Sequence, residues 1–195
     1  MKQVGLFFGS FNPIHIGHLA LANYMLEFEN IEEIWFVVSP QNPFKNADEL
    51  LSAEQRLEMV CIATQKEPKY RAEDIELSLP IPSYTIDTLK ALEKKYTDCC
   101  FSIIMGADNI ARFEHWKSAE EIIANHRIYV YPRHGTNLHS HTLTHNCKIT
   151  AAPLIEIASS DIRQWIKEGK QTPFFLPAKV FEYIQSKGLY LDDKN

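Results

Sequence analysis

The chain has 195 residues, of which 45% are hydrophobic, 23% charged and 11% aromatic. This length and composition fit one globular domain and exclude collagen-like, low-complexity and intrinsically disordered chains. The 20 Lys and Arg against 25 Asp and Glu give a formal net charge of −5, which argues against binding to nucleic acid by bulk electrostatics. The apolar runs are far shorter than the ~20 residues that cross a bilayer, so we expect no membrane segment and a cytoplasmic location. The four cysteines have no C-x-x-C spacing, which favours reduced thiols.

Apolar strands and amphipathic helices alternate along the first two thirds of the chain. Strands are predicted at residues 3–8, 33–38, 100–105 and 127–131, and helices at 17–29, 52–66 and 84–96. Ser52 and Gln55 have the spacing of a capping box at the start of the second helix. The alternation predicts an α/β fold with a parallel sheet and helices on both faces, and such sheets bind ligands at the carboxyl ends of their strands.

The last third of the chain is less regular. Residues 132–147 are polar and turn-rich, which predicts a surface excursion. A strand is predicted at 154–158, and helices are predicted at 159–167 and at 177–187, where Gly188 ends the last one. Because we find no repeat or linker, we expect one domain over residues 1–195, with a helical tail at 153–195.

The most informative stretch is residues 9–18, GSFNPIHIGH, which lies between the first strand and the first helix. Gly9 and Gly17 allow the backbone to approach a ligand closely, and N–H groups at a helix start can bind phosphate. His15 and His18 project from the same turn. The positive end of the helix dipole disfavours imidazolium, so we expect neutral imidazoles that donate to phosphate oxygens. The alternative is that both histidines only cap and pack a turn.

A second signal lies at residues 157–163, IASSDIR. Ser159 or Ser160 is expected to cap the following helix, and Arg163 lies on the same face one turn later. Hydroxyls, helix N–H groups and a guanidinium would then converge on one point, which suits a triphosphate. The alternative is a capped surface helix with a solvated arginine.

These stretches carry a resemblance to a known family. Residues 9–18 resemble the H-x-G-H signature of the nucleotidyltransferase superfamily in its adenylyltransferase form. Class I aminoacyl-tRNA synthetases also carry H-I-G-H, but they are much longer and have a K-M-S-K-S loop that this sequence lacks. Residues 157–163 resemble the I-S-S-T-x-I-R motif, with Ala158 and Ser160 as departures. Residues 83–89, SYTIDTL, and the later Gly106, Asp108 and Trp116 are similar to blocks of bacterial nicotinate-nucleotide adenylyltransferases.

The resemblance covers the whole chain and implies a Rossmann-like, doubly wound sheet with the 153–195 tail completing an ATP site. It implies transfer of AMP from ATP to nicotinate mononucleotide, giving nicotinate adenine dinucleotide and pyrophosphate in NAD biosynthesis. The partners would be these two substrates, with Mg²⁺ arriving on ATP and no metal held by the protein. No nucleic acid or membrane is expected, and homo-oligomerisation stays open.

The resemblance also implies roles for individual residues. The catalytic residues would be His15, His18 and Arg163. The ATP-binding residues would be Gly9, Ser10, Phe11, Gly17, Ser159, Ser160 and Arg163. The residues that bind the mononucleotide would be Lys45, Thr85, Asp108, Trp116 and Arg133. In physical terms, helix-start N–H groups near Thr85 can receive a carboxylate and Trp116 can stack on a pyridinium ring.

Some alternatives remain at this stage. Phosphopantetheine adenylyltransferases share both phosphate motifs but lack the 83–89 and Trp116 blocks. A nucleotide-binding protein without transferase activity would also keep both motifs. The histidines of the 132–147 segment could hold a metal, although their irregular spacing favours a variable loop. They are His134, His139, His141 and His145, with Cys147 beyond.

Overall fold

The computed structural model describes residues 1–40, 50–110, 112–136 and 145–191. Within these ranges six parallel strands form one sheet in the order β3-β2-β1-β4-β5-β6. The strands are β1 Lys2–Gly9, β2 Glu33–Val38, β3 Tyr70–Glu73, β4 Cys99–Gly106, β5 Arg127–Tyr131 and β6 Cys147–Ile149.

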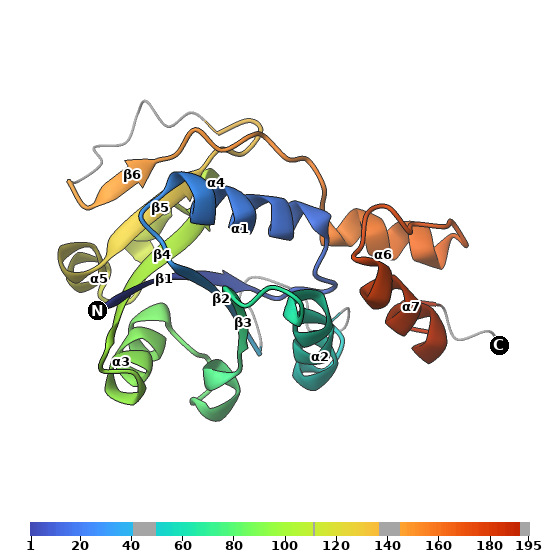
Figure 1. The fold of residues 1–195 in the computed structure, drawn as a ribbon, viewed down its shortest axis with the longest axis horizontal. Coiled ribbons are helices and arrows are strands. Elements are labelled where there is room, and N and C mark those ends of the chain that lie inside the picture. Colours follow the sequence, from blue (N-terminus) through green and yellow to red (C-terminus); the bar gives the residue numbers. More distant parts are fainter. Residues whose placement is uncertain (41–49, 111, 137–144, 192–195) are drawn as a thin grey trace.

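Helices cover both faces of the sheet, and α6 and α7 lie beyond the carboxyl ends of the strands (Figure 1). The α-helices are α1 Ile16–Phe28, α2 Ala53–Thr64, α3 Thr85–Lys95, α4 Ala107–Ile110, α5 Ala119–Asn125, α6 Ser159–Lys167 and α7 Ala178–Lys187. Two short 3₁₀ helices are η2 Ile75–Ser78 and η3 Phe113–His115. In the described part of the chain, no helix is both long and apolar enough to span a membrane.

The strand order is that of the Rossmann-like doubly wound fold, so the predicted fold class is confirmed. The order reverses between β1 and β4, which are neighbours in the sheet although far apart in sequence. At this point the connection after β1 crosses to one face of the sheet and the connection after β4 crosses to the other. A crevice forms between the two connections, and sheets of this kind bind their ligands there.

Local signals fixed several element ends as predicted. At the start of α2, the Ser52 Oγ accepts from the Gln55 backbone N at 3.2 Å, and the Gln55 Oε1 accepts from the Ser52 backbone N at 3.3 Å. Gly188 ends α7 with φ 60°, a left-handed conformation that costs glycine little.

The predicted strand at 154–158 is wrong. These residues are not part of the sheet, and the edge strand is β6, which begins at Cys147, the last residue of the predicted surface excursion. Ile155 and Ile157 pack against the apolar cluster beside α1, so the alternating apolar residues serve packing and not strand pairing. The prediction also missed β3, α4 and α5, which are too short to show a clear periodicity.

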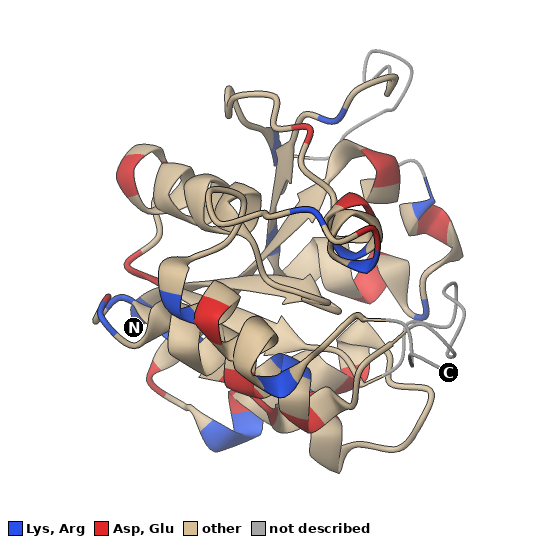
Figure 2. Ribbon diagram, turned by 90° about the vertical axis from the view of Figure 1, so that its right-hand side faces the viewer, with Lys and Arg blue, Asp and Glu red and all other residues tan. Residues whose placement is uncertain are grey.

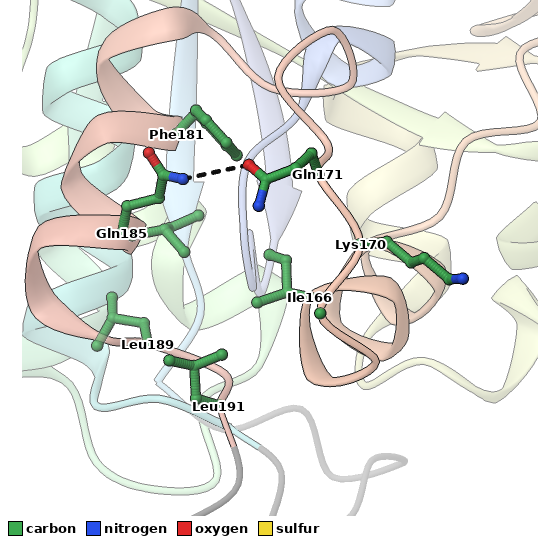
Figure 3. Close-up of a pocket in the computed structure, with 9 residues that line it drawn as sticks. Ile166, Lys170, Gln171, Phe181, Gln185, Leu189 and Leu191 are labelled. Carbon is green, nitrogen blue, oxygen red and sulfur yellow. Dashed lines mark hydrogen bonds between the residues drawn. The ribbon is translucent and has the colours of Figure 1, made fainter.

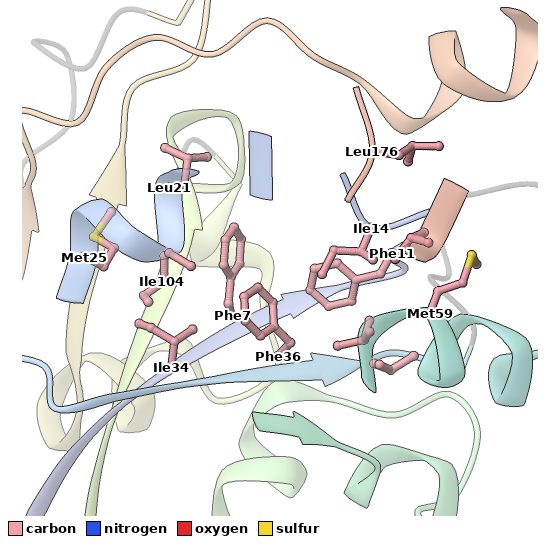
Figure 4. Close-up of a cluster of buried hydrophobic side chains, with 14 of the residues drawn as sticks. Phe7, Phe11, Ile14, Leu21, Met25, Ile34, Phe36, Met59, Ile104 and Leu176 are labelled. Atoms are coloured by element: carbon pink, nitrogen blue, oxygen red, sulfur yellow. The ribbon is translucent and has the colours of Figure 1, made fainter. Parts of the chain in front are cut away.

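Side chains of the sheet divide between two apolar clusters, one on each face. On β1, Phe7 joins the cluster on the α1 face, whereas Val4 and Leu6 join the cluster on the α3 face, as expected from strand alternation. The first cluster runs from Met25 to Leu176 (Figure 4), so that it reaches from α1 into the tail. The tail is therefore packed on the carboxyl end of the sheet.

Candidate functional site

A cavity of about 280 Å³ lies at the carboxyl ends of β1 and β4. Its walls come from the ends of β1, β2 and β4 and from the starts of α3 and the segment after η3. Among the lining residues are Gly9, Ser10, Ser39, Glu76, Ser83, Tyr84, Thr85, Gly106 and Trp116. The cavity thus opens at the switch point of the sheet, where the topology predicts a ligand.

The loop from Gly9 to His18 is strained at Phe11, whose φ is 46°. A bulky residue in the left-handed region costs of order 1–3 kcal/mol, and such strain concentrates at functional sites. The Phe11 ring is only 2% exposed and lies in the core, with its ring centroid 5.1 Å from that of His18. The side chain of Phe11 therefore packs against the ring of His18. If Phe11 binds ATP, it does so through its backbone.

Both glycines of the first motif make room for rings of the same motif. A Cβ at Gly17 would lie 3.0 Å from the Nδ1 of His15, and one at Gly9 would lie 2.8 Å from the Phe11 ring. A larger residue at either position would displace these rings.

The imidazoles of His15 and His18 stack, with ring centroids 3.7 Å apart. The backbone N–H of His15 donates to the Nδ1 of His18 at 3.2 Å. Because this Nδ1 accepts, the proton of a neutral His18 is on Nε2, which becomes a donor. His15 is 4% exposed. Burial, helped by the charge of Arg133, lowers the pKa of His15 to about 4, so burial enforces the neutral imidazole that the helix dipole suggested.

The buried His15 should make stability depend on pH. Between about pH 6.5 and about pH 4 the unfolded chain takes up a proton at this imidazole and the folded chain does not. The free energy of unfolding should therefore fall as the pH falls through this window, by up to about 3 kcal/mol at 1.36 kcal/mol per pK unit. Urea unfolding of the wild type and of His15→Asn at pH 7, 6, 5 and 4 measures this, since the variant lacks the contribution. His134→Asn, at an exposed site, should behave as the wild type; parallel curves for the wild type and His15→Asn would contradict the assignment.

The second motif contacts the first motif directly. The Ser159 Oγ donates to the Pro13 carbonyl at 2.9 Å, and the Arg163 Nη1 donates to the Asn12 carbonyl at 3.0 Å. The Tyr190 hydroxyl, just beyond α7, donates to the Asn12 Oδ1 at 2.8 Å. The tail thus holds the loop between β1 and α1, and Ser159 and Arg163 lie beside it, as the sequence suggested.

The predicted serine cap of α6 is wrong. The N-cap is Ala158, and it makes no side-chain cap hydrogen bond. Ser159 is the first helical residue, and its hydroxyl is used by the Pro13 carbonyl. Ser160 is exposed, with its Oγ 3.4 Å from the Oδ1 of Asp161.

Arg56 is a site residue whose importance the sequence did not show. Arg56 and Met59 match an R-x-x-M helix of the family, and a core-facing methionine with a structural salt bridge is the alternative explanation. In the structure Met59 is buried in the core, and the 1% exposed guanidinium of Arg56 donates to backbone carbonyls. The acceptors are the carbonyls of Ser10, Ser39 and Pro40, each at 2.7 Å, and of Leu51 at 3.0 Å. One buried side chain therefore joins the segments that follow β1 and β2.

The residues expected to bind the mononucleotide are partly brought together. Thr85 is the first residue of α3, and both it and Trp116 line the cavity. Trp116 is half-buried, with its ring centroid 5.3 Å from that of Phe113. The Asp108 Oδ1 lies 3.8 Å from the Arg133 Nε, and a Cβ at Gly106 would collide with this carboxylate. Lys45 lies outside the described residues.

Unpartnered polar atoms mark the same place. In the described part of the chain, five buried side-chain polar atoms have no hydrogen-bond partner, and three of them are Ser10 Oγ, His15 Nδ1 and Arg133 Nε. Buried polar groups are normally satisfied, so this concentration indicates where a polar ligand binds. Sequence reasoning also missed Glu76, which bonds to Ser83 and Thr88, and Tyr190, which bonds to Asn12 across 178 positions.

No protein-held metal centre is found in the described ranges, where no three His, Cys, Asp or Glu side chains form a metal-binding group. Of the histidine-rich segment, His139 and His141 lie outside the described residues, and His134 is 80% exposed. Mg²⁺ is commonly held by phosphates, waters and one or two carboxylates.

Other surfaces are less suited to the chemistry. A second hollow lies between α6 and α7 (Figure 3), lined mainly by apolar side chains such as Ile166, Phe181 and Leu189. Its facing amides, Gln185 and Gln171, bond to each other at 3.4 Å. Viewed from the side of the tail, basic and acidic residues are interspersed (Figure 2). Among the described residues, none of the buried polar atoms without a hydrogen-bond partner belongs to the lining of this hollow.

Comparison with known proteins adds independent findings. Residues 6–165 match the cytidylyltransferase-like family model. The chain is 47% identical over 193 residues to the probable nicotinate-nucleotide adenylyltransferase of Flavobacterium johnsoniae, covering 96% of this chain and 98% of that protein. It is 46% identical over 183 residues to the protein of the same name from Bacteroides thetaiotaomicron, covering 94% of this chain and 91% of that protein.

Solved structures share the fold. The nicotinic acid mononucleotide adenylyltransferase of Plasmodium falciparum, complexed with NaAD, matches with a TM-score of 0.74 and 18% identity, covering 97% of this chain and 98% of that one. The same protein complexed with APC gives a TM-score of 0.75 at 19% identity, with the same coverage. From the family model and from relatives nearly half identical over almost its whole length, the chain belongs to the cytidylyltransferase-like family and, within it, to the nicotinate-nucleotide adenylyltransferases.

Proposed function

We propose that the protein transfers AMP from ATP to nicotinate mononucleotide at this crevice. The products are nicotinate adenine dinucleotide and pyrophosphate, and the reaction is a step of NAD biosynthesis. The observation that carries the proposal is the contact of Ser159 and Arg163 with the loop that bears His15 and His18. Beside this loop lies a cavity with a tryptophan and a helix start in its wall. The names of the relatives support the same reaction.

The attacking group is a phosphate of the mononucleotide. Its second pKa is near ~6, so it is mostly ionised at neutral pH and needs no side chain as general base. Catalysis then consists of positioning and of stabilising the charge that develops on the leaving pyrophosphate. No covalent intermediate with the enzyme is expected.

On the ATP side, His18 donates through Nε2–H and His15 donates beside it to α- and β-phosphate oxygens. Arg163 and Ser160 hold the β- and γ-phosphates, and Mg²⁺ arriving with ATP would neutralise part of their charge. A guanidinium has five N–H donors, so Arg163 can bind both the Asn12 carbonyl and phosphate. Gly9, Ser10, Phe11 and Gly17 would contact ATP through the backbone and the Ser10 hydroxyl.

On the acceptor side, Trp116 stacks on the pyridine ring and the first N–H groups of α3 at Thr85 receive its carboxylate. Arg133 binds phosphate and is oriented by Asp108. Lys45, which lies outside the described residues, is proposed to bind the substrate phosphate on the family resemblance alone.

The reaction is tested by measuring pyrophosphate release from ATP and Mg²⁺ with nicotinate mononucleotide, nicotinamide mononucleotide or phosphopantetheine as acceptor. We expect release to favour the nicotinate nucleotide strongly. Release with phosphopantetheine alone would overturn the roles of Thr85 and Trp116. ATP binding without release from any acceptor would indicate a nucleotide-binding protein without transferase activity.

Trp116→Ala should raise the KM for nicotinate mononucleotide roughly 5- to 150-fold, because stacking on an aromatic ring is worth about 1–3 kcal/mol per base. The KM for ATP should stay within about twofold, since the ring lines the acceptor cavity and not the His15–His18 loop. Trp116→Phe keeps a stacking ring and should recover most of the affinity. Steady-state kinetics with each substrate varied in turn measure both constants, and equal increases in the two KM values would contradict the assignment.

We also propose that residues 1–195 form one domain in which the 153–195 tail completes the ATP site. The support is that Ile162, Val180 and Ile184 of the tail belong to the same apolar cluster as Phe7 of β1. The cytoplasm is the proposed location, since ATP and a nucleotide are the substrates and the apolar runs are short. No nucleic acid or membrane takes part in this reaction.

A further inference from the structure

Glu76 is a buried carboxylate in the wall of the cavity. It lies in η2, is 3% exposed and lines the cavity together with Ser83 and Thr85. The fully buried Thr88 donates through Oγ1 to the Glu76 Oε1 at 2.8 Å. The Ser83 Oγ donates to the Glu76 Oε2 at 3.2 Å. The Ser39 hydroxyl also acts on this carboxylate and lowers its pKa, so three hydroxyls favour the charged form of one acidic side chain, two of them through the hydrogen bonds just given.

The three donors occupy positions that define the acceptor pocket. Ser83 directly precedes Tyr84, the N-cap of α3, and Thr88 lies in the first turns of that helix. Ser39 follows β2 and its carbonyl is already held by Arg56. An ionised carboxylate is acceptor-only, with room for several donors. Glu76 therefore joins the end of β2 to the turn and the helix that offer N–H groups to the ligand.

Burial and the hydroxyl bonds act on Glu76 in opposite directions. Burial is the larger cause and raises its pKa, whereas the bonds from Thr88, Ser39 and Ser83 lower it. Hydrogen bonds to a charged group are stronger than those to a neutral one, so an ionised Glu76 holds its three partners most firmly. A carboxylate buried in a pocket for an anionic substrate is costly unless it is satisfied in this way.

We propose that Glu76 is a positioning residue that shapes the Ser83–Thr85 turn and thereby sets the preference for a pyridine carboxylate over a pyridine amide. The inference rests on the proposed function and deepens it. A cluster of backbone N–H donors suits a carboxylate, which only accepts, and opposes an amide, whose NH₂ group would face other donors. When the turn is held less firmly, the acid loses more binding than the amide, and the discrimination falls.

Glu73 provides a matched control on the same segment. Its side chain is 1% exposed, and it is bound by Arg71 at 3.0 Å, by Lys95 at 3.6 Å and by the Tyr96 hydroxyl at 3.3 Å. It is not among the residues that line the acceptor cavity. Replacing Glu73 therefore removes a buried charged group three residues from Glu76 and leaves the Ser83–Thr85 turn unaffected.

The test compares the wild type, Glu76→Gln and Glu73→Gln in steady-state assays with nicotinate mononucleotide, nicotinamide mononucleotide and ATP each varied. For Glu76→Gln we expect the KM for the nicotinate nucleotide to rise about tenfold, because a charge-assisted network becomes neutral. The KM for ATP should stay within about twofold, and the ratio of the two kcat/KM values should move toward the amide by about tenfold. Glu73→Gln should lower Tm and leave this ratio unchanged.

Two results would overturn the proposal. In the first, Glu76→Gln lowers Tm as Glu73→Gln does and leaves the ratio of kcat/KM for the acid to kcat/KM for the amide unchanged. This result would indicate a purely structural role. In the second, the KM values for both nucleotides and for ATP rise together, which is a general loosening of the fold. If Glu76→Gln does not fold, Thr88→Val removes one donor at nearly constant volume and should reduce the ratio in the same direction, while Thr88→Ser keeps the hydroxyl and should restore it.

Failure of the proposed function would look different. The wild type would then release no pyrophosphate with nicotinate mononucleotide. Calorimetric titration of that nucleotide into the wild type and Glu76→Gln would decide the inference alone. Weaker binding by the variant would support the positioning role, whereas equal binding, or none to either protein, would overturn it.

Discussion

Replacing His18 with alanine should lower kcat by ~10²–10³ and leave the fold intact, because a preorganised donor aimed at developing charge is worth about 2.7–4 kcal/mol. The acceptor role of Nδ1 toward the His15 backbone leaves Nε2–H as the donor. The ring is held by edge contacts with Phe7 and Phe11, at centroid distances of 6.0 and 5.1 Å. Pyrophosphate release gives kcat, and circular dichroism gives the Tm.

The controls separate loss of the donor from loss of the ring. His18→Gln carries an N–H group near the position of Nε2 and should recover part of the rate. His134→Ala removes an imidazole that is 80% exposed and should have no effect. A folded His18→Ala enzyme with normal kcat would remove His18 from the mechanism.

Replacing Arg56 with methionine should lower the free energy of unfolding by about 3–5 kcal/mol and nearly abolish activity. The 1% exposed guanidinium satisfies four backbone carbonyls, and methionine would leave them buried without this donor. At 2–4 °C per kcal/mol for a chain of this size, Tm should fall by roughly 6–20 °C. Activity should fall because Ser10 and Ser39, which are held by the same side chain, line the cavity.

Two variants test whether the several N–H donors of the Arg56 guanidinium account for its effect on stability. Arg56→Lys keeps the charge but has a single ammonium that cannot span four carbonyls, so we expect an intermediate Tm. Arg127→Met removes an exposed arginine at the start of β5, and it should cost far less. Unchanged Tm and kcat for Arg56→Met would contradict this account of the loops.

The sequence predicted those parts of the fold that local patterns determine. The apolar runs of β2 and β5 fixed their bounds, and Ser52 and Gly188 fixed helix ends, because each signal lies within a few residues of its effect. The spacing of His15 and His18, and of Ser159 and Arg163, likewise identified the loop before α1 and the start of α6, which contact each other. The apolar alternation at 154–158 misled because Ile155 and Ile157 bury their side chains without pairing as a strand.

Two of the missed residues, Arg56 and Tyr190, act over long separations in sequence. Arg56 reaches the Ser10 carbonyl across 46 positions, and Tyr190 reaches Asn12 across 178. A backbone carbonyl has no sequence signature, so neither partner could be inferred. Glu76 stands in a segment with several acidic residues, and only the fold shows that its side chain, unlike that of Asp74, is buried at the cavity.

The bonds from Ser159, Arg163 and Tyr190 to the Asn12–Pro13 loop join positions 146 to 178 residues apart, which has a consequence for synthesis of the protein. Translation produces the histidine motif early and its tail partners much later, and contacts of such long sequence range form late in folding. A nascent or truncated chain that ends before residue 159 would contain the whole motif but none of these three bonds. Nucleotide binding should therefore appear only once the tail has been made and has docked.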